Sequence, residues 1–308
     1  MPVTNAHTHL ELTSLSFLYS EGPGNLRPWM NSVYRHMNQL TNEQVLAAIQ
    51  QGINELLSIG TTHVVDISTR WLSFEPLLKS GLQGVVCLEV RGLEKERALK
   101  KLEEAKTRIY CARSENKSST VQIGLSLHAP YSCHPLLLKK GAAWCAAEKV
   151  PLCIHVGESP GEKRWIQQAR MAAFMGGKPL FRRIAATASR FFSGKEPIFY
   201  LDSLGVLAIR PFLVHCTNLS EREIFRVAES GSAVVHCPRS NERLSSGRMP
   251  LERFISAGIP VYIGTDSVAS CPDLNVYEEI AFAKHVHSGL VKKSDLDDFI
   301  HRSLPSYH

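Results

Sequence analysis

The stretch VTNAHTH, residues 3–9, opens the chain with a short run that ends in two histidines. Side chains at positions i and i+2 of a β-strand point to the same face, so His7 and His9 are predicted to project together. Two imidazoles held side by side can share a divalent cation, because each offers a lone pair. A His-x-His pair also arises by chance, so the metal interpretation depends on the rest of the chain.

Seven further apolar runs are separated by segments with helical periodicity, such as residues 42–60 and 94–109. Near-continuous runs of Val, Ile and Leu are typical of parallel strands buried on both faces. Eight strands alternating with helices predict an α/β fold, a (β/α)8 TIM-type barrel, with an open doubly wound sheet as the alternative. The predicted strands are residues 3–9, 62–68, 84–90, 121–129, 151–156, 211–216, 232–237 and 260–266.

Histidine or aspartate falls at the ends of six of these predicted strands. Active sites of (β/α)8 enzymes are built at the C-terminal ends of the strands, so these side chains should converge if the barrel closes. Six of the 13 histidines at one rim is too many for isolated core residues, and imidazole with carboxylate suits zinc or iron. The converging residues are His7, His9, His128, His155, His215, His236 and Asp266.

The order of these residues resembles the amidohydrolase superfamily. The segments NAHTHLEL, HAPYS, HVGES, VHCTNLSEREI, HCPRSN and GTDSVAS resemble, more narrowly, its aminohydrolase branch. That branch contains nucleoside and nucleobase deaminases, aminofutalosine deaminase-like enzymes and triazine hydrolases. The resemblance extends from about residue 3 to residue 280.

The resemblance implies one divalent metal ion, zinc or iron. Glu158 is implied to be the proton shuttle, His215 to polarise the attacking water, and Asp266 to accept a proton from it. The predicted strand 4 contains no lysine, the residue that bridges two metals in binuclear relatives, which favours a single ion. The implied ligands are His7, His9, His155 and Asp266, and the implied substrate contacts are His128 and His236.

The chemistry of these residue types agrees with a hydrolytic deaminase. A cation held by three neutral imidazoles and one carboxylate keeps a positive charge, and it lowers the pKa of bound water from about 15.7 to around 7. Glu158 lies three residues after His155 and can reach a ring nitrogen of a substrate. Protonation of that nitrogen makes the adjacent carbon electrophilic, and attack at a C–NH2 carbon releases ammonia.

The predicted substrate is a heterocyclic amine that resembles a purine or pyrimidine, with an aminofutalosine-like compound among the candidates. One alternative keeps the same water attack and expels chloride or an alkylamine, as triazine hydrolases do. The other is a non-catalytic, truncated barrel. Glu11 and Arg239 fall at the same rim and are further candidates for substrate contact. Glu162 is expected at the surface, and Ser240 and Asn241 are expected to shape a loop.

Composition indicates a globular cytoplasmic protein whose partner is a small molecule. The net charge of +6 does not require nucleic acid, and the apolar runs are too short to span a membrane. The opening MPVTNAHTH lacks the basic and apolar segments of a signal peptide. The eight cysteines form no CxxC pair and are interpreted as free thiols.

Residues 1–308 are predicted to form one metal-dependent hydrolase barrel domain. Members of the resembled branch carry longer segments at both ends, which together form a small β-sandwich, and most of that small domain is expected to be missing here. The barrel surface against which it would pack is a candidate homodimer interface. Residues 163–205 interrupt the alternation with basic and aromatic residues, and are interpreted as a helical lid or as an ordinary amphipathic helix pair.

Overall fold

Eight parallel strands are hydrogen-bonded in chain order in the computed structural model, which describes residues 1–22, 24–116, 120–162 and 196–305. A backbone bridge between Thr8 and Asp266 joins the two ends of the sheet. His9 N donates to Asp266 O at 3.1 Å, and Asp266 N donates to His7 O at 3.0 Å. These bonds bring the last strand beside the first, so the predicted TIM-type barrel is confirmed.

The strands lie where the apolar runs predicted them, with ends shifted by up to three residues. They are β1 Thr4–Thr8, β2 His63–Ser68, β3 Gln83–Val90, β4 Val121–Leu127, β5 Leu152–Val156, β6 Phe212–His215, β7 Ala233–His236 and β8 Val261–Ile263. Because β4 and β8 end before their predicted boundaries, His128 and Asp266 lie on the loops that follow these strands. Loop positions let both side chains turn toward the mouth of the barrel.

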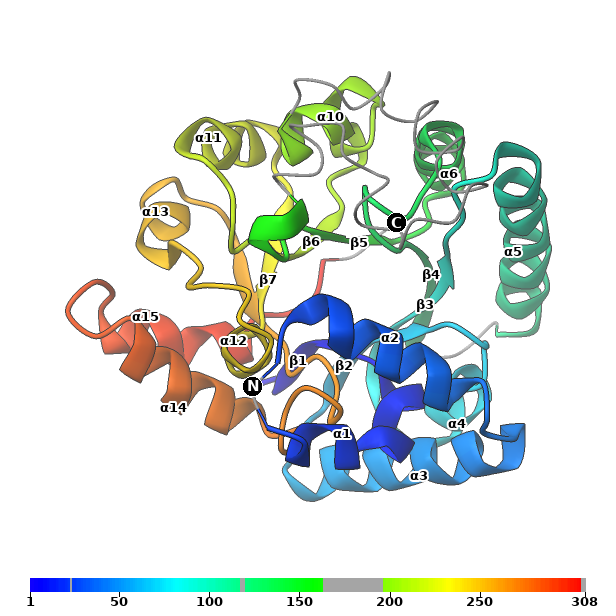
Figure 1. Ribbon diagram of the computed structural model, residues 1–308, viewed down its shortest axis with the longest axis horizontal. Coiled ribbons are helices and arrows are strands. Elements are labelled where there is room, and N and C mark those ends of the chain that lie inside the picture. The colour runs from blue at the N-terminus through cyan, green and yellow to red at the C-terminus, as the bar shows by residue number, and fades with distance from the viewer. Residues whose placement is uncertain (23, 117–119, 163–195, 306–308) are drawn as a thin grey trace.

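Helices surround the strands (Figure 1). The α-helices are α1 Phe17–Ser20, α2 Leu26–Met37, α3 Asn42–Ser58, α4 Phe74–Lys79, α5 Lys95–Glu115, α6 Pro135–Glu148, α10 Pro197–Ser203, α11 Glu221–Ser230, α12 Pro238–Arg243, α13 Leu251–Ser256, α14 Val276–Val286 and α15 Lys293–Asp297. Within the described residues, the 3-10 helices are η1 Leu10–Leu15, η2 Leu207–Ile209 and η3 Asp298–His301. None of the helices in the described residues is long and apolar enough to cross a membrane.

Local sequence signals fix where two of the outer helices begin. Thr41 accepts a hydrogen bond from Gln44 N and the Gln44 side chain accepts one from Thr41 N, which forms a capping box at the start of α3. Ser220 and Glu223 form the same arrangement at the start of α11. Each box satisfies backbone N–H groups that the first helical turn leaves unpaired.

The core has two layers. The inner layer fills the barrel with the inward-facing side chains of the strands, including Val65, Cys87, Phe212 and Val235. The outer layer packs apolar helix faces, such as Ile49 and Leu56 of α3, against the outside of the strands. This filled interior leaves the mouth of the barrel as the place where a substrate can enter. All eight cysteines are free, as predicted.

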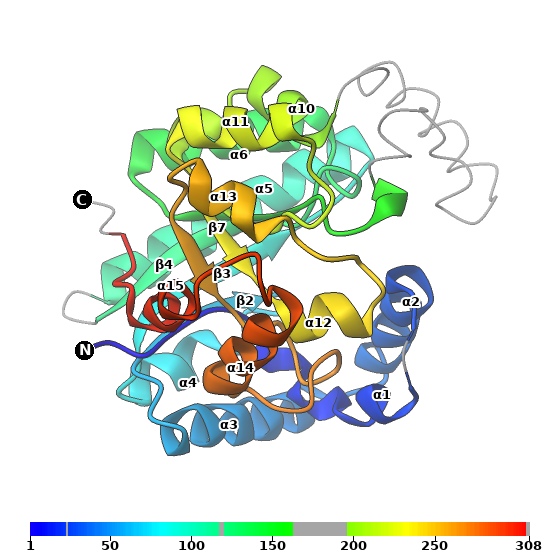
Figure 2. The same ribbon diagram turned by 90° about the vertical axis from the view of Figure 1, so that its left-hand side faces the viewer.

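The mouth of the barrel lies at the end where α2 and α12 are found. β1 begins at Thr4, close to the N-terminus, so the far end of the barrel holds the C-terminal ends of the parallel strands. Figure 2 shows α2 at that far end, away from the N-terminus. Most of the predicted lid, residues 163–195, lies outside the described residues, and α10 packs beside α11 through a hydrogen bond from Ile198 N to Glu223.

Gly264 allows the close approach of β8 to β1. A Cβ atom at this position would lie 2.7 Å from His7 Cβ and 2.9 Å from His7 N. Gly264→Ala should therefore lower the free energy of unfolding by roughly 1–3 kcal/mol, the usual range for overpacking. Chemical denaturation of the metal-free protein measures this change.

Gly24→Ala is the matched control, because its added Cβ would meet only Arg243 at 3.6 Å, an ordinary contact. Equal stability of the Gly264→Ala variant and the wild-type protein would contradict this account of how the barrel closes.

Candidate active site

Three histidine side chains converge at the mouth of the barrel. His7 Nε2 lies 3.1 Å from His9 Nε2 and 3.3 Å from His155 Nε2. Asp266 Oδ1 lies 3.8 Å from His7 Nε2 and 3.6 Å from His9 Nε2. The three histidines, from β1, the residue after it and β5, form a group that could hold a metal ion, and Asp266 on the loop after β8 lies beside two of them.

Two of the nitrogen–nitrogen distances have the length expected in a tetrahedral metal site. Metal–nitrogen bonds of about 2.0–2.1 Å place ligand atoms about 3.3 Å apart at the corners of a tetrahedron. The two Nε2–Nε2 distances match this edge, and the Asp266 oxygen lies a few tenths of an ångström beyond it. The donor set of three imidazoles and one carboxylate suits zinc or iron.

Hydrogen bonds orient the proposed ligands. His155 Nδ1–H donates to the carbonyl oxygen of His128 at 2.8 Å, which leaves the lone pair on Nε2. Asp266 Oδ2 accepts from Ser240 Oγ at 2.6 Å and from Ser270 Oγ at 3.1 Å, which leaves Oδ1 facing the histidines. Such outer partners fix the ligand geometry and strengthen metal binding. The expectation that Ser240 only shapes a loop is therefore wrong.

The histidine ligands are held in the neutral form that binds a metal. Burial, together with the neighbouring His9, His155 and His215, holds the pKa of His7 well below its usual value. Burial also lowers the pKa of His9 to about 4, although the Asp266 carboxylate opposes the shift. Imidazoles in this state present lone pairs at neutral pH without a bound proton to displace.

A second group of possible ligands overlaps the first. Ring nitrogens of His128 and His155 and a carboxylate oxygen of Glu89 lie within 4.8 Å of one another. His155 has only one lone pair available, because its Nδ1–H is donated to His128. The two groups therefore cannot both be filled, and the first group has a further carboxylate, Asp266, beside two of its histidines.

Glu158 lies beside these histidines at the start of the loop after β5. Its Oε2 accepts a hydrogen bond from Tyr131 Oη at 3.0 Å, and its Oε1 lies 3.6 Å from His215 Nε2. Burial raises the pKa of Glu158 to about 7, although the nearby His155 lowers it. A carboxyl group with a pKa near neutrality can both give and take a proton.

His215 is oriented by a residue on α12. His215 Nδ1–H donates to Asn241 Oδ1 at 2.9 Å, so its Nε2 carries a lone pair toward Glu158 and the cavity. Asn241 was expected only to shape a loop, and that expectation is wrong. His215 and Asp266 also have positive φ angles of 73° and 62°. Left-handed conformations of non-glycine residues cost energy and concentrate at functional sites.

Glu162 is buried, so its expected surface position is wrong. It is 1% exposed, and its Oε2 accepts a hydrogen bond from Glu158 N at 3.0 Å. Burial, followed by the charge of Glu158, raises the pKa of Glu162 to about 8. Glu162 therefore carries a proton at neutral pH and fixes the turn that presents Glu158.

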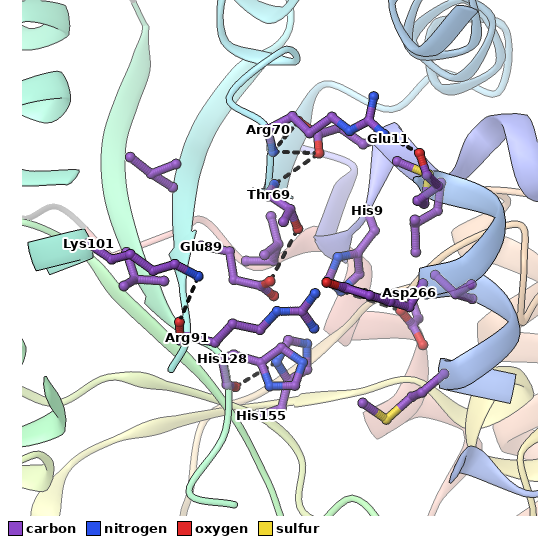
Figure 3. A pocket seen from close by; sticks show the side chains of 18 of the residues that line it. His9, Glu11, Thr69, Arg70, Glu89, Arg91, Lys101, His128, His155 and Asp266 are labelled. Carbon is purple, nitrogen blue, oxygen red and sulfur yellow. Dashed lines mark hydrogen bonds and ion pairs between the residues drawn. The ribbon is translucent and has the colours of Figure 1, made fainter. Parts of the chain in front are cut away.

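The site opens into a cavity of about 450 Å³ with two unlike walls. Helix α2 supplies an apolar and aromatic wall that includes Trp29, Met30 and Val33. The ends of β2 and β3, with α5, supply a polar and charged wall (Figure 3). Described residues of the polar wall include Thr69, Arg70, Glu89, Arg91, Lys101, Glu104 and Arg108. His9, His128, His155, Glu158, His215 and Asp266 line the floor.

Three of the four side chains predicted to contact substrate interact with other protein groups instead. The Glu11 carboxylate lines the cavity, yet it accepts hydrogen bonds from Ser68 Oγ and from the backbone N–H groups of residues 69, 70 and 72. Arg239 is paired with Glu279 and Asp273. His236 Nε2 lies 3.1 Å from His287 Nε2. Neither Arg239 nor His236 is among the described cavity-lining residues, so their contact with substrate stays a prediction that this geometry does not support.

Several residues of the site were not found from the sequence. Tyr131 lies within the HAPYS segment, and Glu89 lies within the apolar run GVVCLEV. An acid near the C-terminal end of a buried strand was a readable signal for Glu89, because that end of a barrel strand faces the active site. Tyr131 carried no such signal, since its contact with Glu158 depends on how two loops meet.

Comparison with known proteins places this arrangement in a family. Residues 3–299 match the model of the Amidohydrolase family. The chain belongs to that family. Its aminodeoxyfutalosine deaminase relative from Deinococcus radiodurans is 34% identical over 94% of this chain and 68% of the relative. The 5-methylthioadenosine/S-adenosylhomocysteine deaminase of Thermococcus kodakarensis is 30% identical over 92% of this chain and 61% of the relative.

A solved structure shares the fold. The zinc-bound adenosine deaminase of Xanthomonas campestris superposes with a TM-score of 0.76 at 24% identity, over 92% of this chain and 60% of that protein. This amidohydrolase chain thus spans about 60–68% of the length of these three proteins.

The buried acid Glu162 predicts a pH-dependent stability. Its pKa is about 8 in the folded protein and near the usual 4.5 in the unfolded chain, so the folded state binds one more proton between these values. Stability should therefore fall as pH rises through this window, and Glu162→Gln should remove that loss. The stability gain of the variant over the wild type should grow by roughly 1.4 kcal/mol per pH unit between about pH 5 and pH 8.

Denaturant titrations of the two proteins across this pH range measure the gain. Glu103→Gln removes an acid from the exposed side of α5 and serves as the control. Parallel stability profiles for Glu162→Gln and the wild type would show that Glu162 is ionised in the folded protein.

Proposed function

We propose that this chain is a metal-dependent deaminase that hydrolyses the amino group of an adenine-bearing nucleoside. The observation that carries the proposal is the position of Glu158, an acid with a pKa near 7, beside three histidines that could hold a metal ion at the floor of a cavity. Its relatives support the substrate class, because their names describe aminodeoxyfutalosine, methylthioadenosine and adenosine deaminases.

His7, His9, His155 and Asp266 would hold one divalent cation, and zinc is favoured by the donor set and by the zinc-bound neighbour. Such a cation lowers the pKa of water toward neutrality and so supplies a nucleophile at physiological pH. The chain's own residues must then place the nucleophile, protonate the substrate and keep the heterocycle in position.

Proton transfer is assigned to Glu158. In its protonated form it would donate to a ring nitrogen of the substrate, which makes the neighbouring amino-bearing carbon electrophilic. Tyr131 Oη donates to Oε2, so this bond fixes the carboxyl group while Oε1 remains the oxygen nearer His215. The proton accepted by Asp266 can then pass to the amino group, which leaves as ammonia, while the Glu158 carboxylate takes the hydroxyl proton of the tetrahedral intermediate and is protonated again.

His215 and Asp266 are placed to manage the attacking water. The His215 lone pair on Nε2 can accept a hydrogen bond from water, because its Nδ1–H is committed to Asn241. Asp266 can accept the water proton on Oδ1, since Oδ2 is already held by two serine hydroxyls. Donor and acceptor positions are therefore set before the substrate binds, which reduces the reorganisation needed during the reaction.

The apolar wall suits a flat ring. Trp29, Met30 and Val33 of α2 face the cavity opposite the charged wall. A heterocycle can stack or pack against such a surface while its ring nitrogen points to Glu158. Ring protonation by Glu158 favours an amine over chloride as the leaving group.

Zinc-loaded protein should release ammonia from at least one of adenosine, 5′-deoxyadenosine, 5′-methylthioadenosine and aminodeoxyfutalosine. Glu158→Gln should keep its zinc and lose turnover by about 10² to 10⁴, the usual worth of a positioned acid–base group. His155→Ala should lose zinc and activity together, because it removes a ligand. Ammonia release and zinc content per chain measure the two effects.

The same measurements distinguish this proposal from the two alternatives, a triazine-type hydrolase and a non-catalytic barrel. Zinc-bound protein that releases chloride from chlorinated triazines, and no ammonia from the nucleosides, would replace the proposed reaction. Folded protein that binds less than about a tenth of a zinc ion per chain would indicate a non-catalytic barrel, since sites with three histidines hold zinc tightly.

A further inference from the structure

Glu89 projects into the centre of the cavity from the end of β3. Figure 3 shows its carboxylate between Lys101 on one side and His9 with Asp266 on the other. Thr69 Oγ1 donates to Glu89 Oε1 at 3.2 Å. Burial acts to raise the pKa of Glu89, but the neighbouring His128 and Arg91 lower it to about 2. The proton-transfer scheme proposed above gives this acid no task.

His128 presents a second acceptor next to Glu89. Ser132 Oγ lies 2.6 Å from His128 Nδ1 and 3.1 Å from the carbonyl oxygen of Ala129. When the hydroxyl donates to that carbonyl, it accepts from Nδ1–H, and this tautomer of His128 carries its lone pair on Nε2. A ring nitrogen of His128 and a carboxylate oxygen of Glu89 lie within 4.8 Å of each other. The cavity thus offers two acceptors side by side.

Two adjacent hydrogen-bond acceptors can be satisfied by a ligand with two adjacent donors or by a cation. A cation there would need His155 as its third ligand, and the single available lone pair of His155 faces His7 and His9. The Arg91 side chain also lines the cavity and would repel a second cation. Paired hydroxyl groups on neighbouring carbon atoms satisfy both acceptors without this conflict.

The position of Glu89 along the cavity identifies which part of the substrate it meets. The reacting carbon must lie near Glu158, His215 and Asp266, on the floor. Glu89 stands where the floor meets the polar wall: a carboxylate oxygen lies within 4.8 Å of ring nitrogens of His128 and His155, and the wall continues from Thr69 and Arg91 to Lys101 and Arg108 of α5. The group attached to the heterocycle therefore passes Glu89 on its way to the mouth, and in a nucleoside that group is the sugar.

We infer that Glu89 is a specificity-determining residue that accepts hydrogen bonds from the vicinal hydroxyls of the substrate's sugar, with His128 as the neighbouring acceptor. The inference rests on the proposed nucleoside deaminase function and adds how the site selects a ribonucleoside. Thr69 holds one oxygen of Glu89, so the second oxygen is directed to the substrate. Hydrogen bonds to a charged acceptor are strong enough to discriminate between substrates with and without the diol.

The test pairs a variant with a truncated substrate. Glu89→Gln should lower kcat/KM for adenosine by roughly 10- to 100-fold, as expected for the loss of a charge-assisted hydrogen bond. The loss should appear mainly in KM, because the sugar is bound equally in the ground and transition states. For 2′,3′-dideoxyadenosine, which lacks both hydroxyls, the same substitution should change kcat/KM by less than about threefold, because no contact remains to be lost.

Two controls keep the result interpretable. Glu103→Gln removes an acid from the exposed side of α5 and should leave both substrates unaffected. Zinc content per chain shows whether Glu89→Gln folds and keeps its metal. Inhibition constants for the two products, inosine and 2′,3′-dideoxyinosine, show whether the variant loses affinity only for the compound that carries the diol.

An equal loss of kcat/KM for both substrates would overturn the inference and would place Glu89 at the reacting amino group instead. Failure of the wild-type protein to deaminate any nucleoside would overturn the proposed function and this inference together.

Discussion

The close approach of three histidine nitrogens is the constraint on which this site depends. His7 Nε2 lies 3.1 Å from His9 Nε2 and 3.3 Å from His155 Nε2, and the Asp266 carboxylate lies beside His7 and His9. His155 cannot turn its lone pair away, because its other nitrogen is committed to the His128 carbonyl, and Asp266 cannot turn because two serine hydroxyls hold Oδ2. These fixed groups form a candidate metal site in which a cation would accept one lone pair from each ligand.

The residue that closes the barrel also contributes to the site. Asp266 makes the backbone bonds that join the loop after β8 to β1, and its side chain is a proposed ligand. Its left-handed conformation is maintained by this closure. The packed barrel holds Asp266 and His215 in these unfavourable backbone conformations. The bonds between Asp266 and β1 also allow a strand as short as β8 to position a proposed ligand.

The fold and the convergence of the histidines could be predicted from local regularities of the sequence, whereas the choice of ligands among them came from the family resemblance. Apolar runs locate the strands, and strand ends locate His7, His155 and His215. The roles of Ser240, Asn241 and Glu162 could not be read, because each depends on a contact between segments far apart or on burial that only the packed structure creates. Arg239 looked available at the rim, yet Glu279 from α14 pairs with it. Polar residues near an active site thus need tertiary context before a role can be assigned.

X-ray absorption spectroscopy of the zinc-loaded protein tests the central claim most directly. The account predicts four nitrogen or oxygen neighbours at about 2.0–2.1 Å or slightly beyond, with the outer-shell scattering of three imidazoles and no sulfur. Cys216 and Cys237 directly follow His215 and His236, so they are the nearest sequence candidates for a competing thiolate ligand. A sulfur neighbour at about 2.3 Å, or fewer than three imidazoles, would contradict the assignment of His7, His9, His155 and Asp266.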